Sequence, residues 1–315
     1  MIRSGTSRFI VLLEAELPTG KARAKLILDL LAKAVPTDGV GGRHYQSNKV
    51  AVLGRGRGEA SFVFHFYQVV PEARRLYSNM ECSNAASSSG LAAMLLGMAR
   101  PNLFGTLHSI NVATNQTVEV IPPSSECWEG DWGVRFTNLH HLWSHMTQSA
   151  QLFRFRHKGL LVTGAIVRHG NIFVMTELPT AKVTPELVNV LSQRGEVFAK
   201  RIGHPATLPK VFVYEVTGKT RREIQCDAVC FSEGQQHHSL PGSGAMALGS
   251  FLTARNELPL PLRDDHARTT FHFTHPSGSL MARVHLSRAS SHWQIHATSF
   301  ETPVRLLMYG NLIRS

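Results

Sequence analysis

Two segments about half a chain apart share an unusual pattern, in which a tight turn leads into small and apolar residues without a polar face. They cover residues 81–98 and 240–252. A helix without a polar face is surrounded by other structure, so each segment predicts a central core helix. A helix N-terminus offers unpaired N–H groups and a positive dipole end to an anion. We therefore expect the two helix starts to face one another and form an anion-binding site, with Cys82 at its edge.

The remaining pattern repeats one order of elements in the two halves. In the first half it predicts strands at residues 8–14, 49–53, 60–70 and 105–120, a helix at 18–34 and a turn at 38–42. In the second half it predicts strands at 159–168, 171–177 and 210–216, a helix at 184–200 with Thr184 as its N-cap, and a hairpin at 271–285. Between residues 122 and 158 the hydrophobic and polar positions alternate with no clear period.

This order favours an α+β fold with two similar domains, each wrapping a sheet around one apolar helix. We assign residues 1–135 to the first domain and residues 136–294 to the second. Whether a C-terminal strand at 295–315 returns to the first domain is left open.

The amino-acid composition excludes only a few functional classes of protein. The 315 residues are 43% hydrophobic and 17% charged, and no apolar run is long enough to cross a bilayer. No signal peptide precedes Glu14, and the four cysteines lack zinc-site spacing. We expect a cytoplasmic protein with free thiols, no metal and no membrane partner. The net charge of +11 comes from scattered pairs without a nucleic-acid-binding motif, and it favours a small anionic partner such as a carboxylate metabolite.

Five short motifs occur in order along the chain. They are Arg3-Ser4-Gly5-Thr6-Ser7-Arg8, the block 38–51 that contains Lys49, Cys82-Ser83-Asn84, His237-His238 with Gly242-Ser243-Gly244-Ala245, and His275-Pro276-Ser277-Gly278. Together they resemble the PrpF family of methylaconitate-type isomerases, within the diaminopimelate epimerase-like superfamily. The resemblance extends from the first residues to about residue 280.

The resemblance implies two domains, each a barrel-like sheet around a central helix, with the active site in the cleft between them. It implies a metal- and cofactor-independent isomerase that shifts a C=C double bond in a small unsaturated carboxylic acid by 1,3-proton transfer. We expect a monomer or a homodimer. Lys49 and Cys82 fall on the family's catalytic lysine and cysteine. Such chemistry needs an acid and a base, and a cysteine at a helix N-terminus has its thiolate stabilised by the dipole. Substrate would be held by Ser4, Gly5, Thr6, Ser7, Ser83, Asn84, Gly242, Ser243 and Gly244.

Two departures from the family pattern refine this expectation. Arg43, His44, Tyr45 and Gln46 replace small hydroxyl residues, so we expect them to line the site and to suit a different acid, for example in an alkylproline-type biosynthetic pathway. Pro241 stands where the two-cysteine epimerases have their second cysteine, which argues against racemisation. A racemase or epimerase, a phenazine-pathway-like isomerase, and a non-catalytic anionic-ligand or nucleic-acid-binding protein remain as alternatives. His237, His238 and His275 are assigned to packing and capping in preference to proton transfer.

Overall fold

The chain divides into two compact units. Unit 1 comprises Met1–Ser78, Cys82–Val134 and Thr302–Ser315, and unit 2 comprises Asn79–Glu81 and Arg135–Glu301. The computed structural model describes residues 1–32, 44–123, 128–139, 150–204, 207–220, 223–255, 266–289 and 292–310. The chain passes from unit 1 to unit 2 beside the expected boundary at 135/136. It returns at Thr302, later than the residue 295 considered from the sequence.

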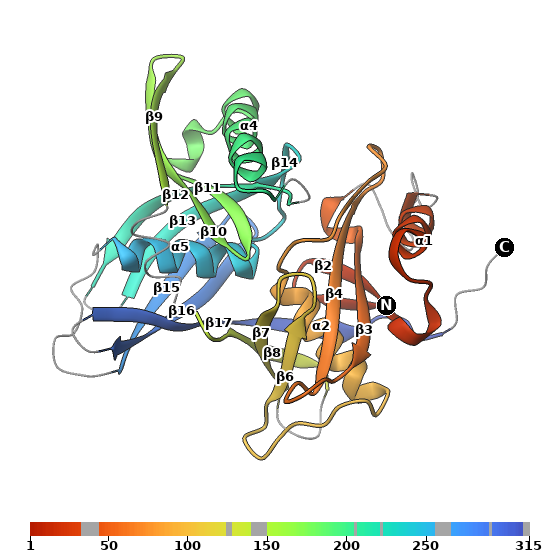
Figure 1. Cartoon of the computed structure of the whole chain (residues 1–315). Coiled ribbons are helices and arrows are strands. Elements are labelled where there is room, and N and C mark those ends of the chain that lie inside the picture. Colours follow the sequence, from red (N-terminus) through yellow and green to blue (C-terminus); the bar gives the residue numbers. More distant parts are fainter. Residues whose placement is uncertain are drawn as a thin grey trace. The chain divides into compact units, whose positions relative to one another are not determined.

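Unit 1 is built from short strands around one helix (Figure 1). Its elements are β1 (Ile2–Ser4), β2 (Ser7–Leu13), η1 (Glu14–Glu16), α1 (Gly20–Ala32), η2 (Tyr45–Ser47), β3 (Lys49–Arg55), β4 (Phe62–Val70), β5 (Arg75–Tyr77), α2 (Ser83–Leu95), β6 (Leu107–Asn111), β7 (Gln116–Ile121), most of β8 (Gly130–Phe136) and the end of β17 (His292–Leu306). Strands β2 and β3 are parallel, as are β4 and β6, whereas β3 and β4 are antiparallel.

Helix α2 is the centre of unit 1. It packs against β1, β2, β3, β4, β6 and β7, and its residues from Ser87 to Gly90 are fully or almost fully buried. Small side chains permit this approach: a Cβ added at Gly90 would lie 3.0 Å from Val120 and 3.3 Å from Trp132. The prediction of a core helix at residues 81–98 is confirmed.

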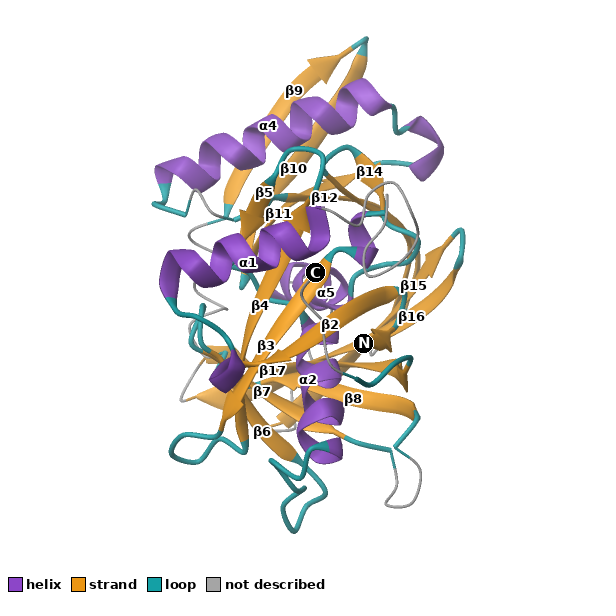
Figure 2. Cartoon of the chain, turned by 90° about the vertical axis from the view of Figure 1, so that its right-hand side faces the viewer, coloured by secondary structure: helices purple, strands orange, loops and turns teal. Residues whose placement is uncertain are grey.

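Helix α1 covers the opposite face of the sheet in unit 1 (Figure 2). Ile27 and Leu31 pack with Ile10, Val50 and Val52 from β2 and β3. Because side chains alternate along a strand, Lys49 and Ala51 project from the other face, toward α2. Strand β3 therefore has one face under α1 and one face under α2.

Unit 2 repeats this order of elements. It comprises β9 (Gln151–His157), β10 (Leu160–His169), β11 (Asn171–Glu177), η4 (Thr180–Lys182), α4 (Pro185–Arg201), β12 (Lys210–Lys219), β13 (Glu223–Ser232), β14 (Gln235–Gln236), α5 (Gly242–Ala254), β15 (His266–His275), β16 (Gly278–Ala289) and most of β17. The parallel pairs β11–β12 and β13–β15 correspond to β2–β3 and β4–β6. The predicted duplication of an α+β arrangement is therefore confirmed.

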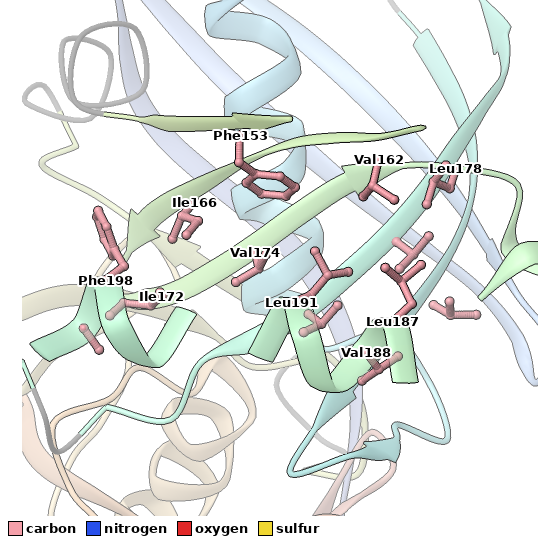
Figure 3. Packing of buried hydrophobic residues seen from close by; sticks show 14 residues of the cluster. Phe153, Val162, Ile166, Ile172, Val174, Leu178, Leu187, Val188, Leu191 and Phe198 are labelled. Carbon is pink, nitrogen blue, oxygen red and sulfur yellow. The ribbon is translucent and has the colours of Figure 1, made fainter. Parts of the chain in front are cut away.

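The central helix of unit 2 is α5, in which every residue is buried. Helix α4 packs on the outer face of the sheet, where Leu187, Val188 and Leu191 meet Val174 and Val211 (Figure 3). Thr184 caps α4 as predicted, since its side chain accepts a hydrogen bond from Leu187 N at 3.3 Å.

The sequence pattern did not predict several of the observed strands. Residues 122–158 contain the whole of β8 and β9, and β13 follows the predicted strand at 210–216. Burial alternates along the first part of β13, but Glu223, Asp227 and Ala228 have weak strand preference, which hid the strand in the sequence. The helix predicted at 18–34 is observed at Gly20–Ala32, and the turn predicted at 38–42 lies outside the described residues.

Candidate active site

A two-residue turn between β1 and β2 organises the predicted residues of unit 1. Ser4 and Ser7 face each other across Gly5 and Thr6, and Gly5 has a φ of +54°, which favours glycine. A Cβ at Gly5 would lie 3.1 Å from Thr302 Oγ1 and 3.3 Å from Asn84 Nδ2. The turn therefore packs directly against the first residues of α2.

Lys49 begins β3 and lies on the face of the strand toward α2. Its side chain is buried, with 6% exposed, and its Nζ donates a hydrogen bond to Ser7 Oγ at 3.0 Å. Nζ is also 5.6 Å from the ring centre of Phe9, 5.7 Å from that of Tyr45 and 5.9 Å from that of Phe66. Aromatic faces attract an ammonium group, so three rings and one hydroxyl fix this amine in place.

The segment before β3 contributes two buried side chains. Tyr45 and Gln46 form the short helix η2, and Gln46 Nε2 donates to Thr6 Oγ1 at 2.6 Å. Gln46 therefore holds the Ser4–Ser7 turn, while the Tyr45 ring borders Lys49. His44 is half-buried at the N-cap of η2. Arg43, also predicted to line the site, lies outside the described residues.

Cys82 is the N-cap residue of α2. It is 7% exposed and extended, and its carbonyl accepts hydrogen bonds from Ala85 N at 2.9 Å and Ala86 N at 3.1 Å. Although Cys82 is the N-cap residue, its side chain makes no capping hydrogen bond in the described structure. Within the described residues, Asn84 Oδ1 is buried without a hydrogen-bond partner. The start of α2 thus carries a thiol, N–H groups and an amide oxygen.

Hydrogen bonds connect these predicted residues into one cluster in unit 1. Ser4 Oγ and Ser87 Oγ are 2.9 Å apart, which ties the turn to α2, and Ser7 ties the turn to Lys49. The structure therefore brings the Ser4–Ser7 turn, Gln46 and Lys49 together with the first turn of the helix that Cys82 caps.

The predicted residues of unit 2 have a packing role in the structure. Gly242, Ser243 and Gly244 form the first turn of α5, whose N-cap is Pro241. A Cβ at Gly242 would lie 2.3 Å from the Phe300 ring, and one at Gly244 would lie 2.6 Å from the Phe212 ring. Glycine is required at both positions so that the helix can approach the sheet.

The three predicted histidines hold turns near α5. His237 Nε2 lies 2.9 Å from Ser232 Oγ. His275 Nδ1 lies 2.9 Å from Ser277 Oγ, which in turn donates to the carbonyl of His238. Burial, followed by the nearby His238, lowers the pKa of His275, although a hydrogen bond to the His237 backbone acts in the opposite direction.

The internal repeat also gives unit 2 a lysine in the position of Lys49. Lys210 begins β12 and is paired with Phe173 in the parallel register, as Lys49 is paired with Phe9. Its Nζ is 5.8 Å from the Phe173 ring centre, and the residue is 4% exposed. Sequence analysis missed this equivalence because the two lysines have different flanking motifs.

Cys82, Cys226 and Cys230 are free thiols. Among the described side chains, no three His, Cys, Asp or Glu residues gather as metal ligands would. Each helix in the described part of the chain is too short or too polar to cross a membrane.

Comparison with known proteins identifies the architecture. No protein-family model and no curated protein sequence matches the chain. Among solved structures, methylitaconate Δ-isomerase matches with a TM-score of 0.61 at 17% identity, over 98% of this chain and 93% of that one. A probable proline racemase from Agrobacterium radiobacter K84, with bound carbonate, matches with a TM-score of 0.60 at 12% identity, over 98% and 92%. A hydroxyproline epimerase from Agrobacterium vitis, with bound trans-4-hydroxy-L-proline, matches with a TM-score of 0.59 at 13% identity, over 98% and 88%.

The chain has the diaminopimelate epimerase-like fold. This confirms the resemblance read from the five motifs at the level of fold. The three similar structures have nearly equal TM-scores, so the fold by itself does not separate a double-bond isomerase from a racemase or an epimerase.

The diaminopimelate epimerase-like fold also places residues that the motifs did not indicate. Phe9 and Phe66 border Lys49, Ser87 bonds Ser4, and Thr302 packs against Gly5. In the sequence Phe9 and Phe66 are ordinary strand residues, and Thr302 is far from the turn. Only the alternation within strands 8–14 and 60–70, combined with the position of Lys49, offered a signal for the two phenylalanines.

Proposed function

We propose that this protein is a cofactor-independent isomerase that shifts a C=C double bond in a small unsaturated carboxylic acid by 1,3-proton transfer. Lys49 and Cys82 form its acid–base pair. The observation that carries the proposal is the buried amine of Lys49, held by Ser7 in the same cluster as the helix start capped by Cys82.

The reaction needs two groups and no oxidant. One group removes a proton from the carbon next to the double bond, and the electron pair of that C–H bond becomes the new double bond. The old double bond moves its electrons toward the far carbon, which takes a proton from the second group. Negative charge develops on the carboxylate during the transfer, and the positive dipole end at the start of α2 would stabilise it.

The immediate surroundings of Lys49 suit this role. The ring of Tyr45 and the rings of Phe9 and Phe66 enclose the amine, and the hydroxyl of Ser7 orients it. An acid–base group gains from a fixed orientation, because proton transfer requires hydrogen-bonding distance to the substrate.

An epimerase is the second candidate, because a probable proline racemase and a hydroxyproline epimerase share the fold. An epimerase exchanges a proton between two faces of one carbon and therefore uses an acid or base on each face. Cys82 caps α2, but the equivalent cap of α5 is Pro241, which has no proton to exchange. This difference favours the double-bond shift.

The segment 43–46 supports a substrate other than a standard tricarboxylate. Tyr45 and Gln46 are bulky, and Gln46 is engaged with Thr6, so less room and fewer free hydroxyls remain for several carboxylates. A specialised biosynthetic acid, such as one of alkylproline type, fits this substitution.

The test follows protons by NMR in deuterated water. The protein is incubated with 2-methylitaconate and, separately, with trans-4-hydroxy-L-proline, and deuterium incorporation and product are recorded. We expect exchange and a shifted double bond with the unsaturated acid and no epimer of hydroxyproline. Epimerisation of hydroxyproline, without exchange into the unsaturated acid, would favour the second candidate.

Matched variants assign the roles. Lys49→Met and Cys82→Ala should lose at least about 100-fold in exchange rate, the size of one lost acid–base contribution. Lys210→Met and Cys226→Ala change another buried lysine and cysteine, both outside the cluster, and should keep the rate. Full activity of Cys82→Ala would remove the thiol from the mechanism. Salt-sensitive DNA binding without turnover would instead support a nucleic-acid-binding protein.

A further inference from the structure

A row of three arginines crosses the outer face of the sheet in unit 1. Arg3 on β1 is directly opposite Arg305 on β17 and directly opposite Arg8 on β2. Residues opposite each other in antiparallel strands have Cα atoms about 4.5–5.5 Å apart, so the three side chains start within roughly 10 Å of one another. Arg3 and Arg305 are exposed and Arg8 is half-buried.

The three guanidinium groups have no acidic partner in the described structure. None of the ion pairs between described residues includes Arg3, Arg8 or Arg305. Arg3 Nε donates to the carbonyl of Gly5 at 3.1 Å, a bond inside the hairpin that leaves its terminal nitrogens available. Like charges directly opposite on neighbouring strands destabilise a sheet. The arrangement is costly unless an anion neutralises it.

The row is rigidly supported. Arg3 lies on the middle of three hydrogen-bonded strands, and Gly5 N donates to Pro303 O at 2.8 Å, which fixes the hairpin to β17. The N-terminus lies beside β2 and β17 in Figure 2. Planar guanidinium forks on fixed strands suit bidentate contacts with a tetrahedral oxyanion.

We propose that Arg3, Arg8 and Arg305 bind a phosphoryl group of a small ligand or a phospholipid. A carboxylate carries one negative charge and would leave most of the row uncompensated. A phosphoryl group carries about −1.5 to −2 near neutral pH and offers three acceptor oxygens, so it can engage more than one arginine.

The side chains next to the arginine row help to distinguish a soluble phosphorylated ligand from a phospholipid as the source of the phosphoryl group. Leu307, Met308 and Tyr309 come two to four residues after Arg305 and are 45%, 58% and 77% exposed. Apolar and aromatic side chains beside cations suit the boundary of a phospholipid layer, whereas a free phosphate uses the arginines alone. The experiment therefore includes both sources.

The full chain is titrated with inorganic pyrophosphate by calorimetry and, separately, tested for sedimentation with phosphatidylcholine vesicles that contain phosphatidic acid. The triple variant R3Q/R8Q/R305Q is compared with R55Q/R57Q/R100Q, which removes the same charge from exposed arginines outside the row. We expect the first variant to bind at least about 100-fold more weakly and the second to bind as the unaltered chain does.

The calorimetry and the vesicle sedimentation distinguish the two sources of the phosphoryl group. Pyrophosphate binding that depends on the row supports a soluble phosphorylated ligand, and vesicle binding that depends on it supports a phospholipid. Equal losses in both triple variants, or binding to neither probe, would overturn the proposal. Circular dichroism checks that each variant folds. If the triple variant does not fold, the single variant R305Q is tested for binding in its place. Because Arg305 is exposed near the end of β17, that single change should still weaken binding about tenfold.

Discussion

At the residue scale, burial decides which polar side chains need an explanation. Lys49 is buried beside Ser7 and three aromatic rings, and this placement was readable from the sequence only through the family motif. Alone, a lysine beside a strand indicates a surface charge. The complete aromatic enclosure could not be predicted, because Phe9, Tyr45 and Phe66 come from three separate segments that meet only in the fold, and strand alternation gave only a weak signal for the two phenylalanines.

His285 makes the stability of the protein depend on pH. Burial lowers its pKa to about 4, with further lowering by Arg135, Arg268, His296 and Arg283. The unfolded histidine titrates near the ordinary value of about 6.5. Between these two values the unfolded chain binds a proton that the folded chain does not, so stability falls as the pH drops from about 6.5 toward 4.

The measurement is chemical denaturation of the unaltered chain and His285→Gln across that range. We expect the variant to take up fewer protons on unfolding, by up to about one, and to lose less stability in acid. His65 and His275 also have lowered pKa values and stay in both proteins, so the comparison isolates His285. Parallel curves for the two proteins would show that His285 does not contribute.

At the element scale, the two central helices were the most predictable part of the molecule. A run of Gly, Ala and Ser without a polar face has few other uses, and both α2 and α5 are buried as expected. Their polar ends were less predictable. The sequence predicted a tight turn before each helix, and the N-cap residues there, Cys82 and Pro241, make no side-chain capping bond.

Gly242→Ala tests the close approach of α5 to its sheet. A Cβ there would lie 2.3–2.7 Å from three atoms of the Phe300 ring, so the ring or the helix must move. We expect a loss of about 1–3 kcal/mol in unfolding free energy, as for overpacked cores. Gly310→Ala, with no atom within 4 Å of the added Cβ, is the control and should change stability by less than about 0.5 kcal/mol. Equal effects at both sites would contradict this packing.

Thr184→Ala tests the cap of α4. The side chain accepts a hydrogen bond from Leu187 N at 3.3 Å, and removal leaves that N–H without its partner. We expect a loss of about 1 kcal/mol in thermal or urea denaturation. Thr180→Ala, in the short helix η4 before α4, provides a nearby threonine control. An unchanged midpoint for Thr184→Ala would show that water replaces the cap at no cost.

At the scale of the whole molecule, the repeated order of elements is the main organising feature. Strands β2 and β3 with α1 correspond to β11 and β12 with α4, and the equivalence extends to Lys49 and Lys210. The order of elements was visible in the sequence. The exact strands were not, because β1 and β14 are very short and β17 is rich in polar residues.

Because each unit has a core of its own, a core change should act mainly on its own unit. Leu191 on α4 is fully buried against Val174 and Val211, so Leu191→Ala should cost about 2–5 kcal/mol. Hydrogen exchange followed by mass spectrometry should show lost protection in β10–β12 and α4. Ile27→Ala makes the matching change in unit 1 and should reduce protection around α1, β3 and β4. Equal loss of protection in both units would contradict separate cores.

The most direct test of the proposed reaction is a crystal structure with 2-methylsuccinate, a saturated acid that cannot shift a double bond. We predict Lys49 Nζ and Cys82 Sγ each within about 3–4 Å of the bound carbon skeleton, the range needed for proton transfer. A bound acid that contacts neither group, or a Cys82 thiol enclosed by protein on every side, would contradict it.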